Sequence, residues 1–285
     1  MKAIEMINVN KTYPSGFSIK DINLEVEKGT IVGFIGENGA GKTTLIKALA
    51  GILNIDQGQI KIFGKDIKDG DQDIKEDLGL VLDDMFFPLK LNAKDINSIM
   101  QGIYKSWDRD LFYSYLEKFK IPDKLSINAL SKGMKKKLEL ATALSHRPKL
   151  LILDEPTSGL DPVIREEVLD IFLDFIQDED HTIFLSSHIT SDLDKVADEI
   201  IFIDQGEILL AANKDEILNS YGLVKCGLED VEKIDPTYII SKRNTKYFYE
   251  LLVSDKKALE EKHPDFVVDN ISLEDLMVLI IKGEK

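Results

Sequence analysis

Cysteine, positive charge and long hydrophobic runs are all scarce in this sequence. The 285 residues include one cysteine, Cys226, which excludes an internal disulfide and fits a reducing, intracellular location best. No stretch reaches the roughly 18 apolar residues that a membrane helix needs, and the N-terminus lacks the apolar core of a secretory signal. We therefore expect a soluble protein.

Negative charge dominates, because 51 acidic residues stand against 36 basic ones and the formal net charge is −15. Such a balance disfavours nucleic acids and anionic bilayers, which bind proteins through positive surfaces. One basic cluster stands out in the sequence, and we interpret it as the solvated face of a helix: Lys132, Lys135, Lys136 and Lys137. We expect no nucleic-acid partner.

Hydrophobic periodicity predicts the secondary structure. Residues 2–13 and 17–29 alternate apolar and polar side chains, as half-buried strands do. Residues 30–36 form a continuous apolar run with β-branched side chains, typical of a strand covered on both faces. Further apolar runs follow at 149–156, 181–188 and 199–210. Helical segments at 162–176 and 189–197 separate these runs, and alternating strands and helices predict an α/β fold with a parallel sheet.

The chain is predicted to divide into a large domain and a small accessory domain. Residues 1–212 hold all the recognisable motifs, and the part from about 88 to 145 has a helical pattern. Residues 213–285 contain short strand patterns and an amphipathic helix near the end, for which Ser272 is the expected N-cap. We interpret them as a small C-terminal α/β appendage.

The segment "GENGAGKTT", residues 36–44, joins the first buried strand to a helix. It matches the phosphate-binding loop G-x-x-x-x-G-K-[ST], whose glycines let backbone N–H groups converge on a phosphate at a helix N-terminus. We expect Lys42 to reach the β- and γ-phosphates and the Thr43 hydroxyl to hold Mg²⁺. The predicted nucleotide-binding residues are Gly36, Asn38, Gly39, Ala40, Gly41, Lys42, Thr43 and Thr44.

Two adjacent carboxylates end the next apolar run, "LLILDEP". Asp154 and Glu155 would lie at the carboxyl end of a buried strand, where parallel sheets bind ligands. Burying two acids there is costly unless a cation or a reaction uses them. Asp154 fits a Mg²⁺ ligand acting through water, and Glu155 fits a general base that polarises the attacking water.

These motifs, with others in the same order, resemble the ATP-binding cassette (ABC) ATPases. The resemblance covers residues 1–212 and includes a signature-like "LSKGM" at 130–134, "SGLD" at 158–161 and "FLSSH", which ends at His188. It implies a P-loop NTPase (RecA-like) fold with a parallel-sheet core, an N-terminal antiparallel β subdomain and a helical signature subdomain. It also implies ATP and Mg²⁺ as cofactors.

The resemblance implies a role for each of these residues. Tyr13 would stack on adenine, and His188 would stabilise the developing charge, which makes Lys42, Glu155 and His188 the catalytic set. Ser131 is the expected N-cap of the helix that follows. The signature residues that would cap the γ-phosphate held by a second subunit are Ser131, Lys132, Gly133 and Met134. The D-loop residues are Ser158, Gly159, Leu160 and Asp161. Two such sites form in a head-to-tail dimer, either a homodimer or a heterodimer with a related cassette.

Three positions depart from the family pattern. Lys132 and Met134 replace the usual glycine and glutamine, and Asp83 lies where a glutamine is usual. Our hypothesis is that Asp83 serves Mg²⁺ through a bridging water, because a carboxylate is a hard oxygen ligand but this side chain is shorter. The rival hypothesis assigns the task to Asp84 or to neither residue.

The resemblance implies an ATP hydrolase that powers transport through a separate membrane permease. The signature, Asp83 and the C-terminus are similar to the bacterial branch that exports peptides, antibiotics or other amphiphiles. We therefore predict an exporter subunit, peripheral on the cytoplasmic face of the membrane. The segment "MFFP", residues 85–88, is expected either to dock on the permease or to be buried. An importer subunit stays open, as does a cassette ATPase that acts on nucleic acid or ribosomes.

Overall fold

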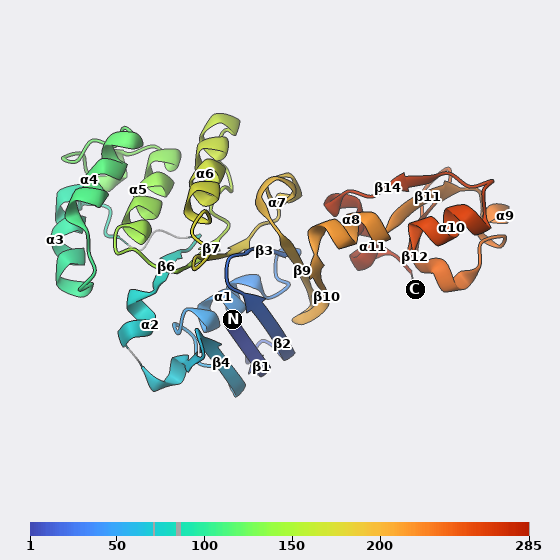
Figure 1. The fold of residues 1–285 in the computed structure, drawn as a ribbon, viewed down its shortest axis with the longest axis horizontal. Coiled ribbons are helices and arrows are strands. Elements are labelled where there is room, and N and C mark those ends of the chain that lie inside the picture. Colours follow the sequence, from blue (N-terminus) through green and yellow to red (C-terminus); the bar gives the residue numbers. More distant parts are fainter. Residues whose placement is uncertain (71, 84–86, 285) are drawn as a thin grey trace.

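The computed structural model describes residues 1–70, 72–83 and 87–284 (Figure 1). A six-stranded sheet lies at the centre in the order β10-β9-β3-β8-β7-β6. Its strands are β3 (Ile31–Ile35), β6 (Leu78–Val81), β7 (Leu150–Asp154), β8 (Thr182–Ser186), β9 (Glu199–Asp204) and β10 (Glu207–Asn213). Every residue of β3, β7 and β8 is buried, as the continuous apolar runs predicted. None of the described helices combines the length and apolar character needed to cross a bilayer.

The central sheet is parallel except at one edge, where the predicted single run at 199–210 is wrong. It forms a hairpin, in which β10 pairs with β9 in antiparallel register. Gln205 and Gly206 make the turn, both with positive φ (46° and 82°), as two-residue hairpin turns require. A Cβ at Gly206 would lie 1.9 Å from the Ser18 carbonyl oxygen, so no larger residue fits there.

An antiparallel sheet from the N-terminal part covers one face of the central sheet. Its order is β2-β1-β4-β5, and its strands are β1 (Lys2–Thr12), β2 (Ser18–Glu27), β4 (Gln57–Ile62) and β5 (Lys65–Asp66). Helix α1 (Lys42–Leu49) packs in the same hydrophobic cluster through Leu45, Ile46 and Leu49. This arrangement confirms the predicted N-terminal antiparallel subdomain and places α1 directly after β3.

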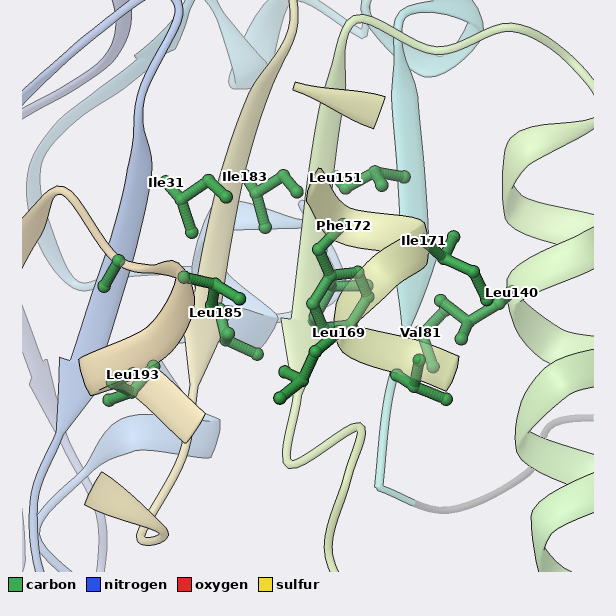
Figure 2. Packing of buried hydrophobic residues seen from close by; sticks show 14 of the residues in the cluster. Ile31, Val81, Leu140, Leu151, Leu169, Ile171, Phe172, Ile183, Leu185 and Leu193 are labelled. Carbon is green, nitrogen blue, oxygen red and sulfur yellow. The ribbon is translucent and has the colours of Figure 1, made fainter. Parts of the chain in front are cut away.

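Helices cover the other face of the central sheet. Figure 2 shows α6 (Pro162–Phe175) with Phe172 and Leu169 directed at Leu185 of β8 and its neighbours. Helix α7 (Thr190–Val196) contributes Leu193 to the same cluster. Phe172 has no exposed surface, so truncating it to alanine would cost about 3–5 kcal/mol of stability.

The predicted helical subdomain contains α3 (Ala93–Ile103), α4 (Arg109–Lys118) and α5 (Lys132–Leu144), preceded by the short helix α2 (Gln72–Glu76). The prediction of a solvated lysine face on α5 is wrong for Lys136 and Lys137, which are buried. The Lys136 ammonium lies 3.0 Å from Glu139, and the Lys137 ammonium lies 2.8 Å from Glu167. Ion pairing with neighbouring carboxylates therefore lets both lysines enter the interior.

The C-terminal elements form a lobe that projects from the β10 edge, orange to red in Figure 1. Its antiparallel sheet has the order β12-β13-β11-β14. The short strand patterns of this region correspond to β11 (Gly222–Cys226), β12 (Ile239–Asn244) and β13 (Tyr249–Val253). The described part of the lobe also holds elements that were not predicted: α8 (Lys214–Ser220), α9 (Leu228–Val231), the 3-10 helix η3 (Pro236–Tyr238), α10 (Lys256–Lys262) and β14 (Val268–Asn270). The expected terminal helix is α11 (Leu273–Lys282), and the Ser272 hydroxyl caps it by accepting from the Asp275 N–H at 3.0 Å.

Candidate nucleotide-binding site

The loop between β3 and α1 has a backbone that only glycine can build. Gly39 and Gly41 have φ values of +87° and +113°, in the left-handed region. A Cβ at Gly36 would lie 2.4 Å from the Ile203 carbonyl oxygen, and one at Gly41 would lie 2.5 Å from Ile19 Cδ1. Glycine is therefore required here, both by the positive φ angles and by the lack of room for a Cβ. Helix α1 begins where the loop ends, so the positive end of its dipole faces the loop.

The Lys42 side chain folds back over this loop. It is 6% exposed, and its ammonium donates to the carbonyls of Gly36 at 2.7 Å and Glu37 at 3.3 Å. The same nitrogen lies 3.7 Å from Glu155 Oε1. A cation is thus held between the loop and the acid at the end of β7, where a phosphate would meet it.

Asp154 ends β7 and is almost fully buried at 1% exposure. Its Oδ2 accepts from the Thr43 hydroxyl at 2.9 Å, and its Oδ1 accepts from the Ser186 hydroxyl at 2.5 Å. A carboxylate beside a hydroxyl at the phosphate loop is the hard oxygen set that Mg²⁺ takes together with phosphate oxygens. Thr43 and Asp154 therefore fit the ion. Ser186 was missed at the sequence level because only the parallel pairing of β7 and β8 brings it to Asp154.

Glu155 follows with a left-handed backbone (φ 49°), a conformation that costs energy in a non-glycine residue. Its N–H lies 3.1 Å from the Ser186 hydroxyl, and its Oε2 lies 2.6 Å from His188 Nδ1. Within the described residues, the buried Oε1 has no hydrogen-bond partner. This oxygen has the Lys42 ammonium 3.7 Å away but keeps its hydrogen-bonding capacity, so it can accept a proton from a water beside the phosphate loop. The structure thus brings the three predicted catalytic residues together.

A cavity of about 550 Å³ opens at this point. Its lining includes most of the predicted loop: Glu37, Asn38, Gly39, Gly41, Lys42, Thr43 and Thr44, together with Phe17, Asp83 and Glu155. Asp83 is therefore placed in the same cavity as Thr43, as the metal hypothesis requires. Asp84, the rival residue, lies outside the described residues.

Two aromatic side chains lie beside the loop. The half-buried Tyr13 directs its hydroxyl at the Thr44 hydroxyl, 3.5 Å away. The Phe17 ring lies 6.3 Å from the Tyr13 ring and lines the cavity itself. The sequence analysis did not assign Phe17 to the site. Its place in the same turn as Tyr13, between β1 and β2, could have indicated it.

The signature residues lie at the start of α5. The Ser131 hydroxyl accepts from the Met134 N–H at 3.2 Å, which confirms the predicted N-cap. Gly133 fits tightly against α6, because a Cβ there would lie 3.0 Å from Ile164 Cγ2. The Lys132 ammonium lies so close to Gly159 that a Cβ at that glycine would be 2.3 Å from it. The signature and the D-loop are therefore neighbours in one chain, and neither contributes to the lining described for the cavity.

The D-loop residues have local roles in this fold. Leu160 is buried, and the Asp161 carboxylate caps α6 by accepting from the N–H groups of Val163 and Ile164, each at 3.1 Å. Just before it, the Thr157 hydroxyl donates to the buried Asp192 carboxylate of α7 at 2.7 Å. Asp192 was also missed, and it links the segment after Glu155 to the helix after His188.

The hydrophobic segment at 85–88 is only partly described, since Met85 and Phe86 lie outside the described residues. Phe87 lines a second cavity of about 200 Å³, between β6 and helices α3 and α5, with Tyr104, Glu139 and His146. Burial raises the pKa of Glu139 and lowers the pKa of His146. The docking of this segment on a permease stays a prediction.

Comparisons with known proteins decide the family. The protein-family model described as "ABC transporter" matches residues 19–158 of this sequence. The bacitracin transport ATP-binding protein BcrA of Bacillus licheniformis is 34% identical over 267 residues, which cover 92% of this chain and 79% of that protein. The chain belongs to the ABC transporter ATP-binding proteins. A second family member, the glutamine transport ATP-binding protein GlnQ of Bacillus subtilis, is 34% identical over 71% of this chain and 87% of its own length.

A solved ATP-binding subunit of an ABC transporter shares the fold of the cassette. It is 24% identical, with a TM-score of 0.69 over 75% of this chain and 91% of that one. The predicted family, the P-loop NTPase fold class and the predicted ATP hydrolase activity are confirmed. The roles of the individual residues stay predictions.

Proposed function

We propose that this cassette powers the export of a peptide, antibiotic or other amphiphile through a separate membrane permease. What supports the exporter branch is the extent of the likeness to the bacitracin transport protein, which spans 92% of this chain. The glutamine transport protein has the same identity, 34%, but the match covers only 71% of this chain. The accessory domain at 213–285 therefore agrees better with the first relative.

The proposed chemistry rests on one observation: Lys42, Thr43 and Glu155 line one cavity, and they are hydrogen-bonded or ion-paired to Asp154, to His188 and to one another. The phosphate loop and Lys42 bind the phosphates of ATP, while Tyr13 and Phe17 offer aromatic faces for adenine. Thr43 and Asp154, together with Asp83, would hold Mg²⁺, which would offset phosphate charge.

Hydrolysis is then driven by the side chains after β7 and β8. Glu155 Oε1, which accepts no hydrogen bond from the described residues, orients a water and accepts its proton. His188 holds the carboxylate through Oε2 and stabilises the developing charge. Lys42 already lies between Glu155 and the loop, so its ammonium can stabilise the charge that develops on the γ-phosphate. These steps assign Lys42, Glu155 and His188 the catalytic roles.

The signature half of the site is proposed to come from a second subunit. Ser131 and Lys132 are exposed at the N-terminus of α5, a 13-residue helix whose first turn offers free N–H groups to an anion. A head-to-tail homodimer, or a heterodimer with a related cassette, would place this turn on the γ-phosphate of the other subunit. ATP binding would close the dimer, and hydrolysis would reopen it and move the permease.

The permease is proposed to dock near Phe87, so that the cassette works on the cytoplasmic face of the membrane. The test is co-expression with a candidate membrane permease, followed by transport into inside-out vesicles. ATP-dependent uptake of a peptide antibiotic, lost with Lys42→Ala, is the expected result. Uptake only in right-side-out vesicles would favour the importer, and a cassette that copurifies with ribosomes or nucleic acid instead of a membrane protein would exclude both.

A further inference from the structure

Helix α11 lies where the C-terminal lobe meets the cassette (Figure 1). Leu273, Leu276 and Leu279 are buried and belong to the same hydrophobic cluster as Leu193 and Val196 of α7. Because α7 begins two residues after His188, the lobe rests directly on the segment that follows the catalytic histidine.

The last residue of α11 reaches the phosphate loop. The Lys282 ammonium lies 3.5 Å from Glu37 Oε1. Glu37 directly follows Gly36, and its carbonyl oxygen accepts from Lys42 at 3.3 Å and from the Ala40 N–H at 3.1 Å. Glu37 is also one of the residues that line the nucleotide cavity. One ion pair thus joins the accessory lobe to the loop that grips the phosphates.

The backbone on either side of Lys282 is fixed by the fold. The buried Ser241 hydroxyl donates to the Leu279 carbonyl at 2.8 Å, and Glu284 exchanges two backbone hydrogen bonds with Lys242 at 2.8 and 2.9 Å. A Cβ at Gly283 would lie 2.3 Å from the Leu279 carbonyl oxygen, so this turn fits tightly. Lys282 therefore points at Glu37 from an anchored position, although its side chain is 61% exposed.

The charge of Glu37 opposes the ligand of this cavity. A carboxylate on the wall repels the triphosphate, and a cation paired with it offsets that repulsion and holds the side chain in place. Both partners are about half exposed, so salt screens the pair and its effect on affinity is modest.

We propose that Lys282 is a positioning residue for ATP binding, which acts by holding and neutralising Glu37 and so lets the accessory lobe set the affinity of the phosphate loop for ATP. The inference rests on the nucleotide site proposed above, and it gives the lobe a role in that site. Whatever displaces α11 from the cassette would then weaken ATP binding.

The test is a double-mutant cycle on the full chain, measured by calorimetric titration with ATP in EDTA and by steady-state ATPase assays. At low salt, Lys282→Met should weaken ATP binding about three-fold, with a smaller effect at high salt. Its KM for ATP should rise while kcat at saturating ATP stays unchanged. In the Glu37→Gln background the same substitution should have no effect, because no carboxylate is left to hold.

Two control variants sharpen this cycle. Lys282→Arg should keep wild-type affinity. Lys262→Met should also leave ATP binding unchanged, because it breaks an ion pair with Asp235 that lies within the lobe, at 2.6 Å. An equal loss from Lys282→Met in both backgrounds, or no loss at all, would overturn the proposal.

Lys42→Ala in the same titration separates the two claims. Undiminished ATP binding by Lys42→Ala would remove the proposed phosphate site, and this inference with it. Loss with Lys42→Ala but none with Lys282→Met would remove only the role of Lys282.

Discussion

The two halves of the proposed ATP site differ in how complete they are within one chain. The half at the phosphate loop, here called the closed half, is buried and internally bonded. Lys42 is 6% exposed, Asp154 is 1% exposed, and both are hydrogen-bonded to neighbouring groups. The half at the signature is open, and Ser131 and Lys132 are exposed at the start of α5. In the proposed account the first half needs only a ligand, whereas the second needs a partner subunit.

Two of the three departures from the family pattern, Lys132 and Met134, lie in the open half, whereas the third, Asp83, lines the cavity of the closed half. Buried groups in the first half each serve several contacts, so a substitution there would break a network. Lys132 is exposed beside Gly159 and Met134 is only partly buried, so a change at either position disturbs fewer contacts than one at Lys42 or Asp154. Substitutions in the first half should therefore reduce ATP hydrolysis far more than substitutions in the second.

Glu155→Gln is expected to give the largest loss of turnover. An amide keeps the shape and the contact with His188 but cannot accept a proton, so hydrolysis should fall by about 10²–10⁴-fold while ATP still binds. Single-turnover hydrolysis with a parallel binding titration measures both quantities. Turnover near wild type would show that another group is the base.

Lys42→Ala should come next. The substitution removes a cation whose contact strengthens as charge develops, so hydrolysis should fall by about 10²–10³-fold and ATP binding should weaken strongly. Lys47→Ala, on the same helix α1, is the matched control and should behave as wild type. Equal activity of the two variants would reject the assignment of the loop.

Asp83→Ala should have an intermediate effect that depends on Mg²⁺. If Asp83 holds the ion through water, the variant should require more Mg²⁺ for half-maximal hydrolysis, by about five-fold, and Asp83→Asn should fall between it and wild type. Asp84→Ala should look nearly normal. A Mg²⁺ titration of ATP turnover that superimposes Asp83→Ala on wild type would take Asp83 out of the site.

Lys132→Ala is expected to have the smallest effect. The ammonium would add attraction for the phosphate of the other subunit from an exposed position, so the ATPase rate at limiting ATP should fall about two- to three-fold and recover as salt screens the charge. Lys135→Ala, one turn further along α5, should change nothing. A loss that is the same at every salt concentration would point to a packing role against Gly159.

The closed half could be predicted from the sequence because its signals are local. A buried run, three glycines, Lys42 and a helical pattern are adjacent in the chain, and strand ends of a parallel sheet meet at one edge. Ser186, Asp192 and the left-handed backbone of Glu155 could not be predicted, since they depend on which strands pair and which helix lies behind them.

Other failures have equally physical causes. Lys136 and Lys137 carry charge on a helix, a pattern typical of solvent exposure, and only the folded neighbours Glu139 and Glu167 make their burial favourable. The contact of Lys282 with Glu37 joins opposite ends of the sequence, and no local pattern encodes it. The hairpin at Gln205 and Gly206 was within reach, because a glycine divides its apolar run.

The central claim is that a second cassette completes the site. The mass of Glu155→Gln in solution tests its homodimer form, in which the second cassette is another copy of this chain, most directly. With ATP and Mg²⁺, size-exclusion chromatography with light scattering should give twice the 32.2 kDa of one chain. Without ATP, or with Lys42→Ala added, it should give the mass of one chain. A variant that binds ATP and Mg²⁺ yet keeps the mass of a single chain would contradict the account.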